Sequence, residues 1–258
     1  MLLGPQRPAP NLAEALAELP DDGPIVTITA GWRVDEAETD ALHAVVGSRA
    51  VHLPLYAWFE QCMERMPAVR ERYKARQGEL IRLKRLYRVR LGAALETVAE
   101  LTRRSEQEPD LVGPQLTHAV EDVRRIDAQF VDHAREVFAA YPEVRRPWEL
   151  PEVRARRLES ARLLSEASTV LVAGGHVGVL RNRMMFFGVH QQLFQAWGQN
   201  TSVVGWGAGA MVLSDRIVLF YDDPPDGPAH PEIFDTGLAM ASGLVLLPDA
   251  RKRLRLHD

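Results

Sequence analysis

A glycine-rich turn around position 207 has the sequence form of a nucleophile elbow. An apolar stretch at 201–205 leads into Gly205-Trp-Gly-Ala-Gly-Ala-Met211, which is the pattern G-x-S-x-G with glycine at its third position. Such an elbow needs small neighbours because its backbone bends sharply and is strained. Gly207 has no side chain that could attack a substrate. The residue types therefore indicate the scaffold of nucleophilic chemistry without the nucleophile.

A second glycine-rich turn, Gly174-Gly175-His176, ends the apolar stretch at 169–173. Turns of this composition between a strand and a helix also bind phosphate groups. A dinucleotide-binding turn, however, has G-x-G-x-x-G at the first strand and an acidic residue about 20 residues further on. The turn at 205–209 comes late and has its third glycine one residue too early. His176 could face a ligand, but we expect its ring to bond the backbone of its own turn.

Other polar side chains near the elbow lack a motif that would make them reactive. Ser202 precedes the turn and Ser214 follows it, and neither has a base at a set spacing. Asp222 and Asp223 belong to a proline-rich loop, where aspartates are usually solvated turn residues. Because the histidines have no spaced ligand partners, we predict neither a metal site nor a bound cofactor.

The elements that must position these turns alternate between strand and helix. Strands at 25–29 and 50–55 with a helix at about 35–46 between them predict a βαβ unit and a parallel sheet. Pro54 places the second strand at an edge or a strand end. The remaining expected elements are a helix at 151–167, strands at 169–173 and 201–205 with a helix broken near Gly188 between them, and strands at 216–220 and 244–247.

Two parts of the chain depart from this alternation. Residues 1–24 are rich in Pro and Asp apart from a short helical pattern, which predicts an arm on the surface. Residues 56–149 predict a helical hairpin inserted into an α/β domain made of 25–55 and 150–258. Pro109, Gly113 and Pro114 separate its helices, and Gly78 either kinks one long helix or separates two shorter ones.

The predicted insertion carries an uneven charge. Between residues 64 and 90 there are ten basic and three acidic side chains, a local charge of +7 in a chain of net charge −4. We define the basic cluster as Arg82, Lys84 and Arg85. It is either a solvated helix face with salt bridges, or a docking surface for an acidic protein, a polyanionic ligand or nucleic acid.

Composition limits the class of protein. The 258 residues include one cysteine, Cys62, which excludes an internal disulfide and a thiolate-rich metal site and predicts a cytoplasmic protein. The acidic net charge argues against nucleic acid or an anionic membrane as a partner of the whole chain. No apolar run reaches the roughly 18–20 residues that span a bilayer.

Three segments in order resemble a known family. They are Val170-Leu-Val-Ala-Gly-Gly-His176, the elbow Val203-Val-Gly-Trp-Gly-Ala-Gly-Ala-Met-Val-Leu213, and Gly237-Leu-Ala-Met-Ala-Ser-Gly-Leu-Val-Leu-Leu-Pro-Asp249. Together they are similar to the serine peptidases that include cyanophycinase and aspartyl dipeptidase, within the class I glutamine-amidotransferase-like fold. The resemblance covers roughly residues 160–253.

The resemblance implies a flavodoxin-like parallel sheet sandwiched by helices. It implies that Gly174, Gly175 and the Ala208 N–H form an oxyanion or ligand site. It also places the nucleophile at Gly207 and the base histidine at Asp249, so both roles are empty.

We therefore expect a non-catalytic protein that binds a small peptide-like or anionic ligand, or that serves in an assembly. It would form a homo-oligomer or bind a protein partner through the helical insertion. An active peptide or amide hydrolase and a partner-binding module built on the basic cluster are the alternatives.

Overall fold

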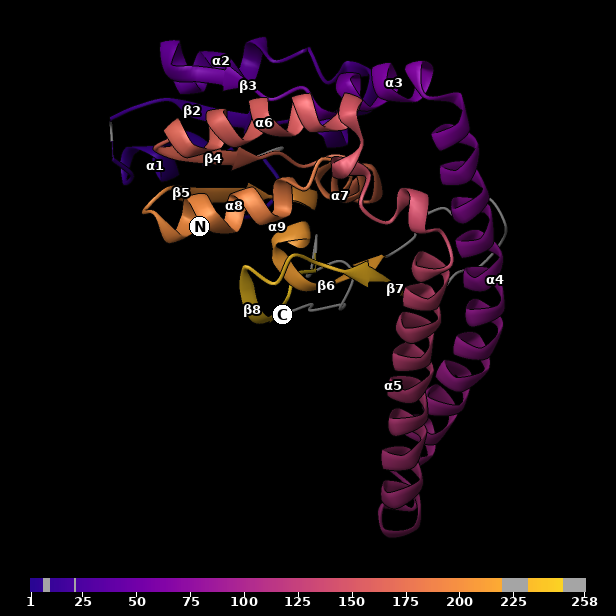
Figure 1. Ribbon diagram of the computed structural model, residues 1–258. Coiled ribbons are helices and arrows are strands. Elements are labelled where there is room, and N and C mark those ends of the chain that lie inside the picture. Colours follow the sequence, from indigo (N-terminus) through magenta and orange to yellow (C-terminus); the bar gives the residue numbers. More distant parts are fainter. Residues whose placement is uncertain (7–9, 21, 220–231, 248–258) are drawn as a thin grey trace. The chain divides into compact units, whose positions relative to one another are not determined.

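The computed structural model describes residues 1–6, 10–20, 22–219 and 232–247 (Figure 1). The chain divides into two compact units, one built from 1–67, 146–218 and 234 onward, the other from 68–145 and 219–233. The predictions for Asp222, Asp223 and Asp249 lie outside the described residues. Within the described part, no helix is long and apolar enough to cross a lipid bilayer.

The first unit contains a five-stranded parallel sheet, which confirms the predicted α/β, flavodoxin-like class. Its order is β1-β5-β4-β2-β3, and every neighbouring pair is parallel. The strands are β1 (Leu2–Leu3), β2 (Ile25–Ile28), β3 (Ala50–His52), β4 (Thr169–Val172) and β5 (Ser202–Trp206). As predicted, β3 lies at an edge and ends before Pro54. The central strands β2 and β4 are buried throughout, as strands covered on both faces must be.

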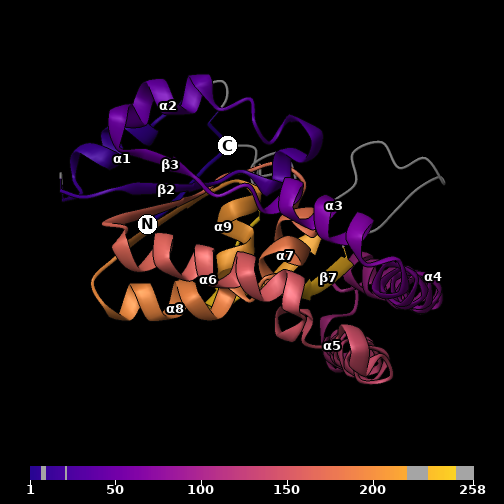
Figure 2. The ribbon, with the colours of Figure 1, turned by 45° about the horizontal axis from the view of Figure 1, so that its top comes forward.

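Helices cover the sheet on both sides (Figure 2). On one side lie α1 (Leu12–Ala17) and α2 (Asp40–Val46), and on the other α6 (Pro151–Glu166) and α8 (Val189–Gly198). The remaining helices of this unit are α3 (Leu55–Arg65), α7 (Val177–Phe186), α9 (Ala208–Leu213) and the 3₁₀ segment η1 (Ala30–Asp35).

Two helix boundaries refine the sequence prediction. The expected break near Gly188 is present, because this residue has a φ of 68° and separates α7 from α8. The helix expected from about residue 35 begins at Asp40, because the residues before it form η1. Its buried residues are Leu42 and Val46.

The N-terminal residues belong to the sheet and its core rather than to a surface arm. Leu2 and Leu3 pair with Gly205 and Trp206, and the Met1 amino group donates a hydrogen bond to the Val203 carbonyl at 2.6 Å. Leu12 of α1 lies in the core cluster with residues of β2, α2, β4 and β5. A strand of two residues is too short to show an alternating pattern, so the sequence gives no sign of it.

A smaller sheet has the order β7-β6-β8. It consists of β6 (Ser214–Leu219), β7 (Glu232–Thr236) and β8 (Ala241–Val245). The expected strand at 244–247 begins earlier, at Ala241. We did not predict β7, because its first buried residue is Glu232 and an acidic residue breaks the apolar pattern of a strand.

The second unit is a pair of helices, α4 (Pro67–Arg104) and α5 (Pro109–Ala139), lying side by side (Figure 1). α4 runs through Gly78 without interruption, so one long helix forms rather than two. Pro109 opens α5, whereas Gly113 and Pro114 lie inside it and do not break it. The core of the pair is Tyr87, Leu91, Ile126 and Phe130.

Candidate functional site

The candidate site lies where the strand order of the large sheet reverses. The chain moves from β2 to β3 on one side and then to β4 and β5 on the other. In open α/β sheets, ligands bind beyond the carboxyl ends of strands at such a point. Here three turns meet, which we call the carboxyl-edge turns: residues 30–33 after β2, 174–176 after β4, and 207–208 after β5.

Backbone contacts join the three turns. The His176 N–H donates to the Gly31 carbonyl at 2.7 Å. A Cβ on Gly31 would lie 2.7 Å from the Gly174 oxygen, and one on Gly175 would lie 2.5 Å from the Gly31 oxygen. Both positions therefore require glycine. Gly174 also lies beside the third turn, because a Cβ there would contact the Trp206 oxygen at 3.4 Å and the Ala208 nitrogen at 3.7 Å.

Gly207 has the sharply bent backbone expected of an elbow. Its φ is 52° and its ψ is −121°, and it directly precedes α9. A Cβ at this position would meet only the Gly174 Cα, at 3.7 Å, which is an ordinary van der Waals contact. There is room for a side chain, and the positive φ is what makes one unfavourable. The position thus has the form of a nucleophile site but carries no group that reacts.

The two glycines that flank Gly207 in the motif have a different reason to be glycine. A Cβ on Gly209 would lie 2.0 Å from the Val172 oxygen, and one on Gly205 would lie 2.7 Å from the Leu213 side chain. Because neither glycine has a side chain, α9 can pack closely against the ends of β4 and β5. They fix the angle at which the chain leaves the strand.

His176 caps α7 instead of pairing with another catalytic group. Its Nδ1 accepts a hydrogen bond from the Val179 N–H at 3.3 Å. The ring lies on the surface. The structure thus brings Gly174, Gly175 and His176 together with Gly207 and Ala208, while Asp249 lies outside the described residues.

Neither serine near the turn at 207–208 lies in that turn. Ser202 is the first residue of β5, and Gly207 follows the other end of this strand. Ser214 is fully buried, and its hydroxyl lies 2.7 Å from the Met211 carbonyl and 3.0 Å from the Arg216 carbonyl. The Ser214 hydroxyl is therefore structural, and the Ser202 hydroxyl lies a strand's length from Gly207.

Arg33 is a residue of the carboxyl-edge turns that the sequence did not reveal. Its φ is 64° and its ψ is −122°, close to the values of Gly207. Its side chain is exposed. No motif surrounds Arg33, and a positive φ at arginine leaves no trace in sequence, so only the backbone geometry identifies it.

A buried glutamate holds the turn that contains Arg33. The two carboxylate oxygens of Glu36 accept hydrogen bonds from the N–H groups of Tyr56 and Ala57, each at 2.8 Å, at the start of α3. Burial raises the pKa of the Glu36 carboxyl, and the two hydrogen bonds and Arg183 oppose this rise. The Thr29 hydroxyl donates to the Glu36 carbonyl at 3.0 Å. Together these bonds tie η1 to β2 and α3.

In the second unit, the basic cluster is divided between one half-buried lysine and two exposed arginines. Lys84 lies 3.0 Å from a carboxylate oxygen of Glu232. Arg88 donates two hydrogen bonds to the same carboxylate, at 2.7 and 2.8 Å. Glu232 is only 2% exposed. Arg82 and Arg85 remain on the surface, so the predicted cluster does not act as one group.

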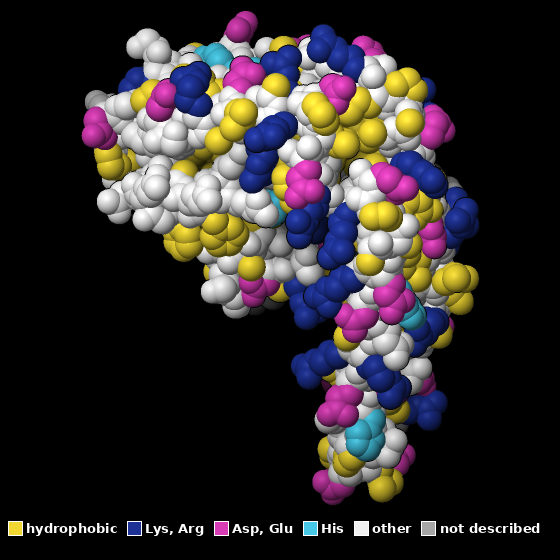
Figure 3. All heavy atoms as spheres, viewed as in Figure 1, with side chains coloured by type: hydrophobic (Ala, Val, Ile, Leu, Met, Phe, Trp, Pro, Cys, Tyr) yellow, Lys and Arg dark blue, Asp and Glu magenta, His cyan; other side chains and the backbone are white. Residues whose placement is uncertain are grey.

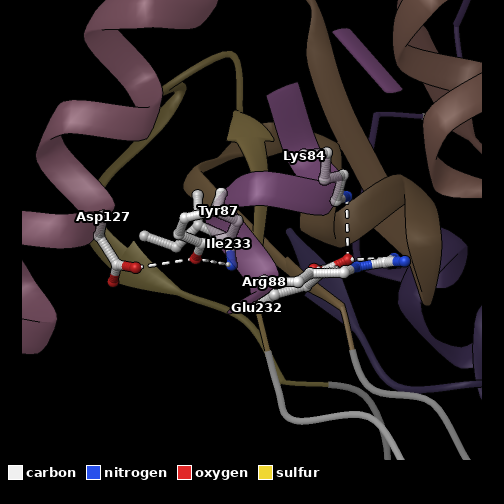
Figure 4. A network of polar contacts seen from close by, with 6 residues as sticks. All are labelled: Lys84, Tyr87, Arg88, Asp127, Glu232 and Ile233. Atoms are coloured by element: carbon white, nitrogen blue, oxygen red, sulfur yellow. Dashed lines mark hydrogen bonds and ion pairs between the residues drawn. The ribbon is translucent and has the colours of Figure 1, made fainter. Parts of the chain in front are cut away.

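The polar network beside Glu232 continues to α5. The Tyr87 hydroxyl donates to Asp127 at 2.8 Å and accepts from the Ile233 N–H at 3.3 Å (Figure 4). Burial, with the Asp127 hydrogen bond, raises the pKa of Tyr87. On the face of the helical pair shown in Figure 3, basic and acidic side chains are interspersed. Much of the positive charge expected here is therefore compensated locally.

A scan against models of protein families found no match, and a search among curated proteins found no significant similarity. Among the described residues, no cluster of three or more His, Cys, Asp or Glu side chains could hold a metal ion.

Proposed function

We propose that the chain is a non-catalytic relative of hydrolases with the class I glutamine-amidotransferase-like fold, similar to the serine peptidase family of cyanophycinase. In this proposal the carboxyl-edge turns bind a small peptide-like or anionic ligand, or the protein serves as a subunit of a cytoplasmic assembly. The observation that carries the proposal is Gly207. Its backbone is bent as a nucleophile elbow requires, yet it has no side chain.

Three further features support this proposal. The turns at 174–176 and 207–208 lie in contact, as an oxyanion site built from backbone N–H groups requires. The first N–H groups of a helix have no partner within that helix, and Ala208 opens α9. Neither Ser202 nor Ser214 lies at the turn, which weakens the alternative of an active hydrolase with a different nucleophile.

Labelling with a fluorophosphonate probe, which reacts with activated serines, tests this proposal. We expect no labelling of the wild-type protein and no hydrolysis of acidic dipeptides or of aspartate–arginine polymers. Gly207→Ser alone should also stay unlabelled, because a serine without a base is a poor nucleophile. The double variant Gly207→Ser with Asp249→His should label weakly at most.

Two outcomes would contradict this expectation. Stoichiometric labelling of a wild-type serine, located by mass spectrometry, would favour the active hydrolase. Rapid labelling of Gly207→Ser alone would show that another residue already serves as the base, and the assignment of that role to position 249 would be wrong.

A further inference from the structure

Arg33 has a backbone conformation that arginine rarely adopts. A φ of 64° with a ψ of −122° lies outside the regions favoured by residues that have a Cβ. A residue held there is strained, and such residues concentrate at functional sites. Glycine would adopt this conformation at much lower cost. The presence of arginine therefore needs a reason that lies in its side chain.

The surroundings of Arg33 fix its backbone, whereas its guanidinium pairs with no residue in the described part of the chain. The Trp32 N–H donates to the Thr29 carbonyl at 2.8 Å, and the Glu36 N–H donates to the Arg33 carbonyl at 3.0 Å. No ion pair or side-chain hydrogen bond joins the Arg33 guanidinium to another residue of the described ranges. Folding thus strains this residue, and among the residues that the structure describes none balances its charge.

The position of Arg33 in the fold explains why this residue is an arginine. It lies two residues beyond Gly31, whose carbonyl bonds the His176 N–H, and Trp32 packs at the place where a Cβ of Gly175 would be. The residue therefore belongs to the edge at the strand reversal where open α/β sheets bind ligands. A guanidinium offers paired N–H donors that match the two oxygens of a carboxylate or a phosphate.

We propose that Arg33 is the recognition residue for an oxyanion group, a carboxylate or a phosphate, on a ligand bound at the carboxyl-edge turns. This inference rests on the proposed function only in that these turns bind a ligand. It adds the chemical class of that ligand and the residue that selects it. The strain at Arg33 is then the cost of presenting a cation beside the glycine turns.

Binding of two simple probes, inorganic phosphate and succinate, tests the inference. Affinity is measured for the full chain by NMR titration, and stability by thermal unfolding with and without each probe. Four proteins are compared: wild type, Arg33→Gln, Arg33→Gly and Arg162→Gln. Arg162 is a matched control, because it is an exposed arginine on α6 near the amino end of β4, at the opposite edge of the sheet.

We expect at least one probe to bind the wild type and Arg162→Gln, with chemical-shift changes at residues 31–33 and 174–176. Both Arg33 variants should bind about tenfold more weakly, as loss of a charged hydrogen bond predicts. Without any probe, Arg33→Gly should melt at a higher temperature than Arg33→Gln, because glycine relieves the strain. Comparing the affinities for phosphate and for succinate shows whether the turns prefer a phosphate or a carboxylate group.

Any of three results would overturn the inference. They are the absence of binding of both probes to the wild type, equal binding by wild type and Arg33→Gln, or a lower melting temperature for Arg33→Gly than for Arg33→Gln. The last would mean that a side chain at position 33 does not strain the fold. Failure here leaves the fluorophosphonate result unaffected, because that result depends on position 207, so the two proposals can fail separately.

Discussion

At the scale of single residues, the carboxyl-edge turns contain glycines of two kinds. At Gly207 the backbone is strained and the space beside it is open. At Gly209 the backbone is ordinary and the space is filled by the Val172 carbonyl. A motif of spaced glycines cannot tell these cases apart, so the sequence predicted the turn but not which of its glycines could accept a side chain.

This difference predicts opposite tolerance to the same substitution. Gly207→Ser should fold and lose about 1–3 kcal/mol of unfolding free energy, the cost of a side chain at positive φ. Gly209→Ser should lose more than about 4 kcal/mol or fail to fold, because its Cβ would overlap a backbone oxygen. Urea denaturation of both variants measures these losses. Equal losses would contradict the steric distinction.

Glu36 gives a prediction about pH. Burial raises the pKa of this carboxyl above its ordinary 4.5, so folding favours the protonated form. The stabilisation from this shift is complete below pH 4.5 and is lost as pH rises through the raised pKa. The substitution Glu36→Gln removes this stabilisation. It also leaves one of the two N–H groups at the start of α3 without an acceptor, because an amide has only one oxygen.

We therefore expect Glu36→Gln to lose about 1–3 kcal/mol at pH 7 and a larger amount at pH 4.5. Chemical denaturation at several pH values measures the difference. Glu38→Gln is the control, because Glu38 is an exposed glutamate two residues further on, and its loss should stay within about 0.5 kcal/mol. A Glu36→Gln penalty that shrinks toward acid pH would contradict the sign of this shift.

At the scale of elements, the strands and helices that the sequence predicted share one property. β2 and β4 are continuous apolar runs, and α4 and α5 keep helical spacing over 38 and 31 residues, so their patterns are long enough to read. β1 is too short to carry a pattern. β7 begins with Glu232, which is buried only because Lys84 and Arg88 pair with it, and one sequence cannot reveal such pairing.

The same pairing divides the basic cluster into residues with different expected roles. Arg82→Gln with Arg85→Gln should weaken binding of heparin, a polyanion probe, and change unfolding free energy by less than about 0.5 kcal/mol. Lys84→Gln should instead lose about 1 kcal/mol, because the buried Glu232 loses one of its cations. Binding should fall steeply with salt. If heparin does not bind at low salt, or binds the double variant equally well, Arg82 and Arg85 belong to a solvated helix face.

At the scale of the whole molecule, the first unit is assembled from three separate stretches of chain. The βαβ logic of the sequence predicted its parallel sheet, because crossover helices between strands permit little else. What it could not predict is the strand beside β5, since nothing local links Leu2 and Leu3 to Gly205 and Trp206.

That pairing also has a consequence in time. During synthesis at about 5–20 residues per second, the ribosome makes Leu3 roughly 10–40 s before it makes Trp206. The entropic cost of closing a loop grows only slowly with its length. The long separation in sequence therefore adds little to the free energy of pairing, and the delay comes from the time that synthesis takes. Leu2 and Leu3 are thus among the last residues of the sheet to find their partner. Until then the far edge of the growing sheet has no strand to complete it, and premature release of the chain before residue 206 would leave Leu2 and Leu3 exposed to other chains.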